Sequence, residues 1–361
     1  MGTPHLDLSV SVVDLAKSLC DIPSVSGDER SITDAIEQAL RPCAHLTITR
    51  SGNALVAATS GGRATRVAIA GHTDTVPIRD NVPSWFEQRD GQRWLVGRGS
   101  VDMKSGVAVQ LALAASLTHL PVDVTWIFYD NEEVSASLNG LGRLAREHPE
   151  LVAADFAVLG EPTAAVIEGG CNGTCRFLVK TTGVRAHSAR AWVGDNAIHH
   201  AAPVLDILAG YAPETIEVEG LAYREGLNAV RIGGGIAGNV IPDECWVEVN
   251  YRFAPNRSEQ EVRDVVARLF GRWQVEFVDF AAGARPGLDA PLAQRFVAAA
   301  GGTAGPKYGW TDVARFAELG IPAVNFGPGD ALKAHADDEA LPVVQIEQCE
   351  RVLRTWLENA G

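Results

Sequence analysis

Short apolar runs recur along the chain and predict buried strands. They lie at residues 67–70, 124–129, 156–160 and 323–327. Helical periodicity appears before or between the runs, at residues 11–19 and 28–40 and in a nearly all-apolar stretch at 107–117. Strands that alternate with helices form a largely parallel sheet, because each crossover connection carries a helix. The pattern therefore predicts an α/β domain with a mostly parallel sheet.

The middle of the chain has a different character. Period-2 alternation at 245–252 predicts a half-buried strand, and further strands are expected at 174–182, 228–232 and 275–280, with helices at 195–208 and 258–270. This order is typical of an α+β domain whose antiparallel sheet is covered on one face. We therefore expect a discontinuous α/β domain of residues 1–176 and 286–361, with an inserted α+β domain at residues 177–285.

Composition narrows the classes of partner. The chain has 361 residues, 46% of them hydrophobic, and a formal net charge of −14. This charge has the wrong sign for binding nucleic acid or an anionic membrane surface. No apolar run is long enough to span a bilayer, and no signal peptide is evident, so we expect a cytoplasmic protein. Reduced thiols are then expected at Cys20, Cys43, Cys171, Cys175, Cys245 and Cys349.

A histidine and a carboxylate, His72 and Asp74, follow the apolar run at 67–70. An imidazole can bind a divalent metal through one ring nitrogen while a nearby carboxylate accepts from the other, which fixes the tautomer. An isolated His-x-Asp pair is more often a hydrogen-bonded surface turn. Further candidate ligands along the chain favour the metal-binding interpretation of this pair.

Histidine, aspartate or glutamate follows each of the predicted sheet strands. These residues are His72, Glu133, Glu161 and His335, and Asp102 lies in the loop between the first two of these strands. The carboxyl ends of parallel strands meet at one edge of a sheet, so the side chains are expected to converge. Asp102 has an alternative role as a helix cap, because it stands just ahead of the helix at 107–117. Two imidazoles and three carboxylates suit zinc or a similar ion, and they are enough for two ions that share one carboxylate.

Five motifs in order make the chain similar to the M20 metallopeptidases, a family of di-zinc amidohydrolases. They are His72-x-Asp74, Gly99-x-x-Asp102-x-Lys104-x-Gly106, Glu132-Glu133, Gly160-Glu161-Pro162 and the late His335. The resemblance covers essentially the whole chain. It implies a mostly parallel, zinc-peptidase-like catalytic domain, in which the insertion is a ferredoxin-like lid and dimerisation domain that makes a homodimer.

The resemblance also implies the roles of the metal-site residues. Asp102 would bridge two Zn²⁺ ions per subunit, with Co²⁺ as a possible substitute. His72 and Glu161 would complete one metal site, and Glu133 and His335 the other. Glu132 would be the general base, and Asp74 would orient His72.

Residues outside the metal site are implied in the same way. A lid histidine, here His187, would reach the active site of the partner subunit and stabilise the oxyanion. The chain departs from many relatives after this histidine, because residues 189–192 carry no proline. Substrate-contact positions are matched by Asn239, Arg252, Thr311 and Arg315.

Three further segments resemble the succinyl-diaminopimelate desuccinylases of this family, at residues 183–188, 238–252 and 309–316. The resemblance thus implies a small N-acyl amino acid as substrate and release of succinate from N-succinyl-LL-2,6-diaminopimelate. Acetylornithine or another N-acyl amino acid is the alternative substrate within the family. A non-catalytic binding protein on the same fold is the alternative of a different class, and it predicts a missing ligand or base.

Overall fold

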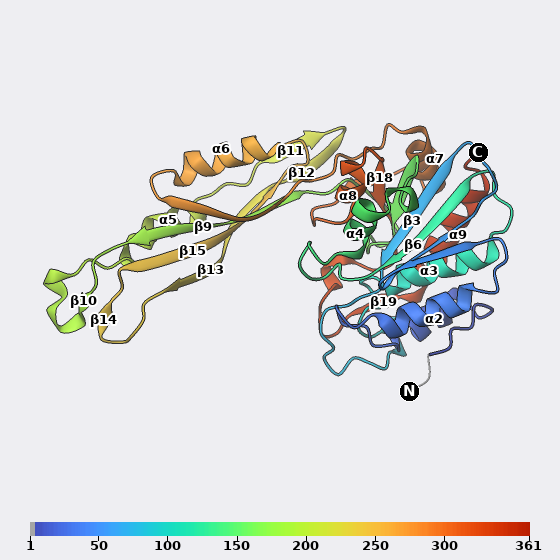
Figure 1. Ribbon diagram of the computed structural model, residues 1–361, viewed down its shortest axis with the longest axis horizontal. Helices are drawn as coiled ribbons and strands as arrows, with labels where there is room; N and C mark the ends of the chain where they lie inside the picture. Colours follow the sequence, from blue (N-terminus) through green and yellow to red (C-terminus); the bar gives the residue numbers. More distant parts are fainter. Residues whose placement is uncertain (1–3) are drawn as a thin grey trace. The chain divides into compact units, whose positions relative to one another are not determined.

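The computed structural model describes residues 4–361, which divide into two compact units (Figure 1). Unit 1 comprises the chain up to Gly169 together with Pro286–Gly305 and Thr311–Gly361. Unit 2 comprises Gly170–Arg285 and Pro306–Trp310, so it contains the expected insertion at 177–285. Each unit buries a hydrophobic core of its own.

Unit 1 is built on an eight-stranded sheet. In spatial order its strands are β1 (Thr47–Ser51), β2 (Ala54–Ala58), β6 (Asp123–Tyr129), β3 (Arg66–His72), β7 (Phe156–Leu159), β18 (Ala323–Asn325), β8 (Ile167–Gly169) and β17 (Ala304–Pro306). β3 is parallel to β6 and to β7, and β18 is parallel to β7. The expected α/β class is therefore confirmed, with the parallel strands at the centre of the sheet. These strands are buried along nearly their whole length, which explains their continuous apolar runs.

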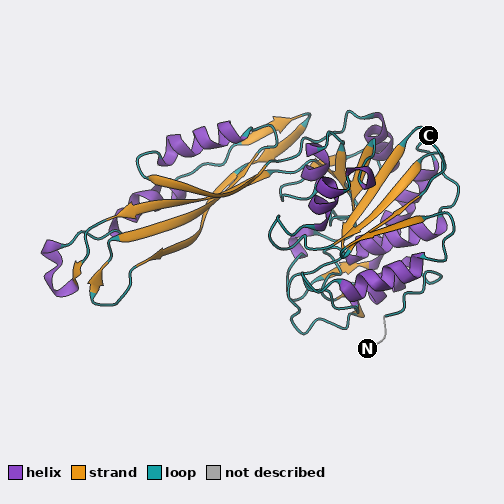
Figure 2. Cartoon of the chain, in the orientation of Figure 1, coloured by secondary structure: helices purple, strands orange, loops and turns teal. Residues whose placement is uncertain are grey.

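Helices cover both faces of this sheet (Figure 2). The larger core lies under α1 (Val12–Cys20), α2 (Arg30–Leu40), α3 (Lys104–Ser116), α7 (Pro291–Ala299) and α9 (Val343–Glu358). Its aromatic centre is Trp356 of α9, whose ring lies 4.5 Å from that of Phe296 and 5.7 Å from that of Phe156. The other helices of this unit are α4 (Gly140–Glu147) and α8 (Val313–Glu318), with 3-10 turns at Pro149–Leu151 and Ala331–Lys333. A small sheet orders β19 (Ala340–Pro342), β5 (Gln92–Val96) and β4 (Trp85–Arg89).

Unit 2 carries a four-stranded antiparallel sheet. Its order is β13 (Gly226–Gly234), β15 (Glu244–Phe253), β9 (Gly173–Thr182) and β16 (Gln274–Ala281). Alternate residues of β9 and β15 join a core with α5 (Ala202–Ala209) and α6 (Glu259–Phe270). Two-stranded sheets pair β10 (Ala186–His187) with β14 (Val240–Ile241) and β11 (Thr215–Val218) with β12 (Leu221–Arg224). Short 3-10 turns lie at Ser188–Val193 and His199–Ala201.

Two expected helices differ in extent from the observed ones. The helix expected at 107–117 begins earlier, at Lys104, because the buried loop before it continues directly into the first helical turn. The helix expected at 195–208 is wrong in its first half. Asp195 instead forms a β-bridge with Val184, and Pro203 marks the first turn of α5, where its missing N–H costs nothing.

Candidate metal centre

Six of the predicted site residues converge at the carboxyl end of the central strands of unit 1. They form three groups whose potential ligand atoms lie within 4.8 Å of one another. The groups are His72 with Glu132 and Glu133, His72 with Asp102 and Glu161, and Asp102 with Glu133 and His335. Asp102 belongs to two of these groups, so its two oxygens serve different neighbours.

His72 is the last residue of β3 rather than a residue beyond it, and it is fully buried. Its Nδ1 lies 3.0 Å from the backbone oxygen of Asp74 and 3.5 Å from the Asp74 carboxylate. The backbone oxygen is therefore the closer partner that orients the ring. Nε2 faces Asp102 Oδ1 at 2.9 Å and so points into the cluster.

Asp102 lies in the loop before α3, and the helix-cap alternative for it is wrong. The N-cap of α3 is Met103, with no side-chain hydrogen bond at that cap. Asp102 instead contacts two imidazoles, because its Oδ2 lies 3.3 Å from His335 Nε2 while Oδ1 faces His72. His335 Nε2 also lies 3.0 Å from Glu133 Oε1. The His335 side chain is 52% exposed, so the cluster opens to solvent on that side.

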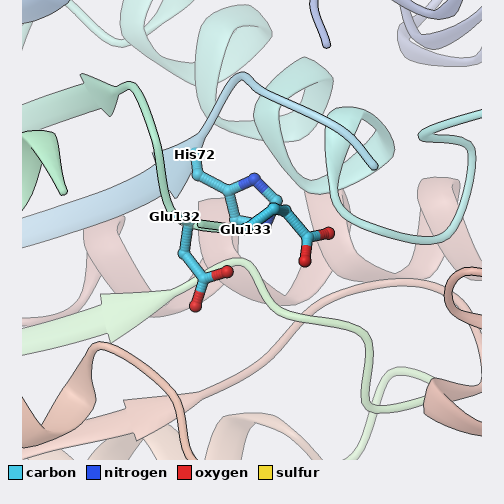
Figure 3. A group of neighbouring side chains, drawn as sticks. All are labelled: His72, Glu132 and Glu133. Atoms are coloured by element: carbon cyan, nitrogen blue, oxygen red, sulfur yellow. The ribbon is translucent and has the colours of Figure 1, made fainter. Parts of the chain in front are cut away.

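Glu132 and Glu133 follow β6 on a segment whose backbone amides are held by carboxylates. Asp74 accepts from Glu132 N at 3.0 Å and from Glu133 N at 3.1 Å. Glu29, which is fully buried, accepts from Asn131 N at 3.2 Å. Asn131 has φ of 59°, in the left-handed region, and the turn there sends the two carboxylates in different directions beside His72 (Figure 3).

The titratable groups of the cluster strongly perturb one another. Burial acts to lower the pKa of His72, but the carboxylates of Asp102 and Asp74 outweigh it and raise the pKa well above its usual value. Hydrogen bonds that its ring donates to the carboxylates of Asp102 and Glu133 raise the pKa of His335 to about 10. Burial is the main reason that the pKa of Glu132 is raised well above its usual range, and nearby Asp312, Glu161 and Glu133 add to the rise.

These pKa shifts indicate a surplus of buried negative charge in the cluster. The carboxylates of Asp102, Glu132, Glu133 and Glu161 converge beside two imidazoles. Nitrogen and oxygen donors of this kind are the ligands that zinc and similar divalent ions prefer. Two divalent ions would offset the four negative charges of these carboxylates, so the residues present fit a two-metal centre.

The remaining predicted residues lie elsewhere. Thr311 and Arg315 are in unit 1, where Thr311 Oγ1 donates to Asn325 at 2.9 Å and Arg315 Nε donates to buried Asp312 at 2.6 Å. His187, Asn239 and Arg252 are in unit 2. There β10 and β14 pair His187 with Val240, next to Asn239, and the His187 side chain is exposed.

Several residues around the cluster were not predicted from the sequence. Asp312 is fully buried between Arg315 and Asn139, which donates to it at 2.8 Å. The rings of Tyr129 and His72 make an edge-to-face contact, with 6.2 Å between the ring centroids. Glu29 and Glu339 accept hydrogen bonds from ligand-bearing loops. Their signal in the sequence is weak, since a single buried acid far from the motif it supports has no recognisable spacing.

The comparisons with known proteins agree with this geometry. The model of peptidase family M20/M25/M40 matches residues 68–359. The chain belongs to this family. The match extends over both units and includes every residue of the metal-ligand groups described above.

Relatives within the M20/M25/M40 family match over nearly the whole chain. A protein of Mycobacterium tuberculosis, provisionally named succinyl-diaminopimelate desuccinylase DapE, is 52% identical over 98% of this chain and 99% of its own. The succinyl-diaminopimelate desuccinylase of Corynebacterium glutamicum is 47% identical over 99% of this chain and 98% of its own. A solved tripeptidase from Staphylococcus aureus shares the fold, with a TM-score of 0.78, 18% identity and 99% coverage of each chain.

Three other expectations are answered by the described residues. None of the six cysteines, all within residues 4–361, forms a disulfide, as predicted. Within residues 4–361, no helix is long and apolar enough to cross a membrane. The alternative of a non-catalytic member predicted a missing ligand or base, and every one of those side chains is present in the cluster.

Proposed function

We propose that this protein hydrolyses the amide bond of N-succinyl-LL-2,6-diaminopimelate and releases succinate and LL-2,6-diaminopimelate. The observation that carries the proposal is 47% and 52% identity, over nearly the full length, to proteins named as desuccinylases of that compound. The convergence of the metal-ligand groups supports a hydrolytic role.

The proposed cofactor is two Zn²⁺ ions per subunit, for which Co²⁺ is a possible substitute because nitrogen and oxygen donors discriminate weakly between these ions. Asp102 would bridge the ions, with His72 and Glu161 on one side and Glu133 and His335 on the other. The support for Asp102 as the bridge is that its two oxygens face different imidazoles, at 2.9 and 3.3 Å.

Bound divalent ions would supply a water of lowered pKa and an electrophile for the amide carbonyl. Glu132 is then the proton carrier. It lies within the cluster beside His72, and a carboxylate placed there can accept a proton from water and later give it to the leaving amine. Asp74 keeps the Glu132 backbone in place through the Glu132 N–H.

Substrate carboxylates are proposed to bind arginines, because a guanidinium pairs with a carboxylate bidentately. Arg252 is half-buried, and burial lowers its pKa, so an anionic partner would be favourable there. Its Nε is held by Asn250 at 3.1 Å. Arg315, Asn239 and Thr311 are the other proposed contacts.

We further propose a homodimer formed through unit 2, in which His187 of one subunit serves the metal centre of its partner. β13 is an edge strand of the unit 2 sheet, and edge strands are ready surfaces for pairing. Val230 and Ile232 on this strand are 51% and 53% exposed, which gives the edge an apolar character. An exposed His187 could then donate a hydrogen bond to the oxyanion.

The test is a paired assay on the zinc-loaded protein. One arm offers N-succinyl-LL-2,6-diaminopimelate and the other N-acetylornithine, each with and without a chelator. We expect chelator-sensitive release of succinate and far slower release of acetate. Preference for the acetyl compound would keep the metal centre and reject the substrate assignment, whereas hydrolysis of neither compound would reject the proposed reaction.

A further inference from the structure

Glu339 is a buried carboxylate that none of the catalytic or ligand roles above uses. It stands four positions after His335 in the sequence, directly before β19, and is 1% exposed. Its Oε1 accepts from Val101 N at 2.9 Å and from Asp102 N at 3.0 Å. Its Oε2 accepts from Gly99 N at 3.1 Å and from Arg98 Nη1 at 2.8 Å. One side chain therefore holds most of the loop that ends at Asp102.

Arg98 extends this contact to the other ligand-bearing segments. The residue is 2% exposed, and its Nη1 donates to Ala336 O at 3.2 Å as well as to Glu339. Its Nε donates to Pro77 O at 3.2 Å, in the segment that follows His72. The Glu339–Arg98 pair thus connects the chain segments that carry His72, Asp102 and His335.

The chemistry of the pair explains why a carboxylate is needed. Four N–H donors converge on two oxygens, and an ionised carboxylate offers only acceptors. Hydrogen bonds to a charged acceptor are stronger than those between neutral groups. Any neutral replacement leaves some of these buried donors without an acceptor, and that costs free energy at the backbone of Asp102 itself.

We propose that Glu339 is a positioning residue for the metal centre, which sets the carboxylate of Asp102 in register with His335. The inference rests on the proposed two-metal function but not on the identity of the acyl group. A residue that only stabilised the fold would change the melting temperature without changing metal affinity. A positioning residue changes metal affinity and coordination.

The test compares Glu339→Gln with a matched control, Glu225→Gln in unit 2. Glu225 is also a buried glutamate, 3% exposed, and it accepts from a backbone N–H, Ala254 N at 2.9 Å, and from an arginine, Arg257 Nε at 2.5 Å. Both substitutions replace one acceptor oxygen by a donor group. Only Glu339 contacts a ligand-bearing loop.

The metal-free form of each variant is titrated with Zn²⁺ against a competing chromophoric chelator, and the visible absorption spectrum of the Co²⁺-loaded protein is recorded. Removing a partner that orients a ligand typically weakens metal binding about 10- to 100-fold. We expect Glu339→Gln to weaken the binding of at least one ion by that factor and to alter the cobalt spectrum. Glu225→Gln should lower the melting temperature and leave both metal readouts unchanged.

Equal zinc affinities and equal cobalt spectra for wild type and Glu339→Gln would overturn the inference. If Glu339→Gln does not fold, Glu339→Asp decides, because it keeps the charge but shortens the reach. Weakened zinc binding by this variant supports the inference, and wild-type affinity refutes it. Failure of the wild-type protein itself to bind zinc would instead refute the proposed metal centre and the inference that rests on it.

Discussion

Buried charge is handled differently in the two units. In unit 2, Glu225 is matched within the protein, because Arg257 Nε, the Tyr251 hydroxyl and Ala254 N all donate to it. In unit 1, the four carboxylates of the metal-ligand groups converge beside two imidazoles. A buried carboxylate that is paired with an arginine of the same unit stabilises the fold. Several converging carboxylates without such partners need bound cations to balance their charge.

The same contrast separates carboxylates within unit 1. Asp74, Glu29 and Glu339 accept hydrogen bonds from backbone amides, while Asp102 and Glu133 turn their oxygens toward imidazoles. The first set is satisfied by fixed donors and orders the loops. The second set remains available to ions. Buried acids of one chemical kind thus serve structure or chemistry according to the groups that face them.

The largest expected effect comes from removing the charge of Glu132. Glu132→Gln should keep both metals and lower kcat by about 10²–10⁴-fold, because the variant cannot accept the proton from water. Steady-state kinetics and metal analysis of the purified variant measure the two quantities. Glu147→Gln, an exposed position at the end of α4, is the matched control. Near-normal turnover by Glu132→Gln would reject the assigned role.

The next effect concerns the contribution of unit 2 to the chemistry of unit 1. His187→Ala should lower kcat by about 10²–10³-fold, the usual cost of losing one oxyanion donor, with unchanged zinc content. His199→Ala serves as the control, because His199 is an exposed histidine of the same unit. A monomeric form of the wild type should be nearly inactive. Full activity of a monomer would contradict a shared active site.

Metal removal should destabilise unit 1 and leave unit 2 unchanged. Each ion at 100 times its dissociation constant stabilises the folded state by about 2.7 kcal/mol. Chelation should therefore lower the melting temperature and increase hydrogen exchange at residues 72–74, 97–102, 131–133 and 335–339. Exchange in β9 and β15 is the internal reference. An equal increase of hydrogen exchange in both units would contradict a stabilising effect of the metals that is confined to unit 1.

The smallest expected effect tests the hydrogen bonds around buried Glu225 in unit 2. Tyr251→Phe removes the hydroxyl that donates to Glu225 at 2.8 Å and should cost about 1 kcal/mol of unfolding free energy. Urea unfolding measures this loss, and zinc titration should show no change in affinity. A change in zinc affinity would mean that the two units do not hold their charges independently.

Much of the fold can be predicted from local pattern. The continuous apolar runs of β3, β6 and β7 identify strands buried on both faces, and the alternation in β15 identifies a strand with one covered face. Ser258 caps α6 in a capping box with Glu261, a signal of sequence spacing alone. Elements with short or mixed patterns, such as β10, β14 and α8, were not predicted, because tertiary contacts rather than the local sequence determine their conformation.

The sequence by itself identified the proposed metal ligands, because residues at the carboxyl ends of parallel strands gather at one edge of the sheet, and the family motifs indicated Glu132 as the proposed base. It also determined the fold class, through the period of the apolar positions. Only the tertiary structure decided that His72 is oriented first by a backbone oxygen, and that Asp102 faces two imidazoles rather than capping α3. The role of Glu339 was likewise visible only in the tertiary structure, since Glu339 and Asp102 are 237 positions apart in the sequence. Contacts of that separation depend on the path of the whole chain, and no local pattern encodes them.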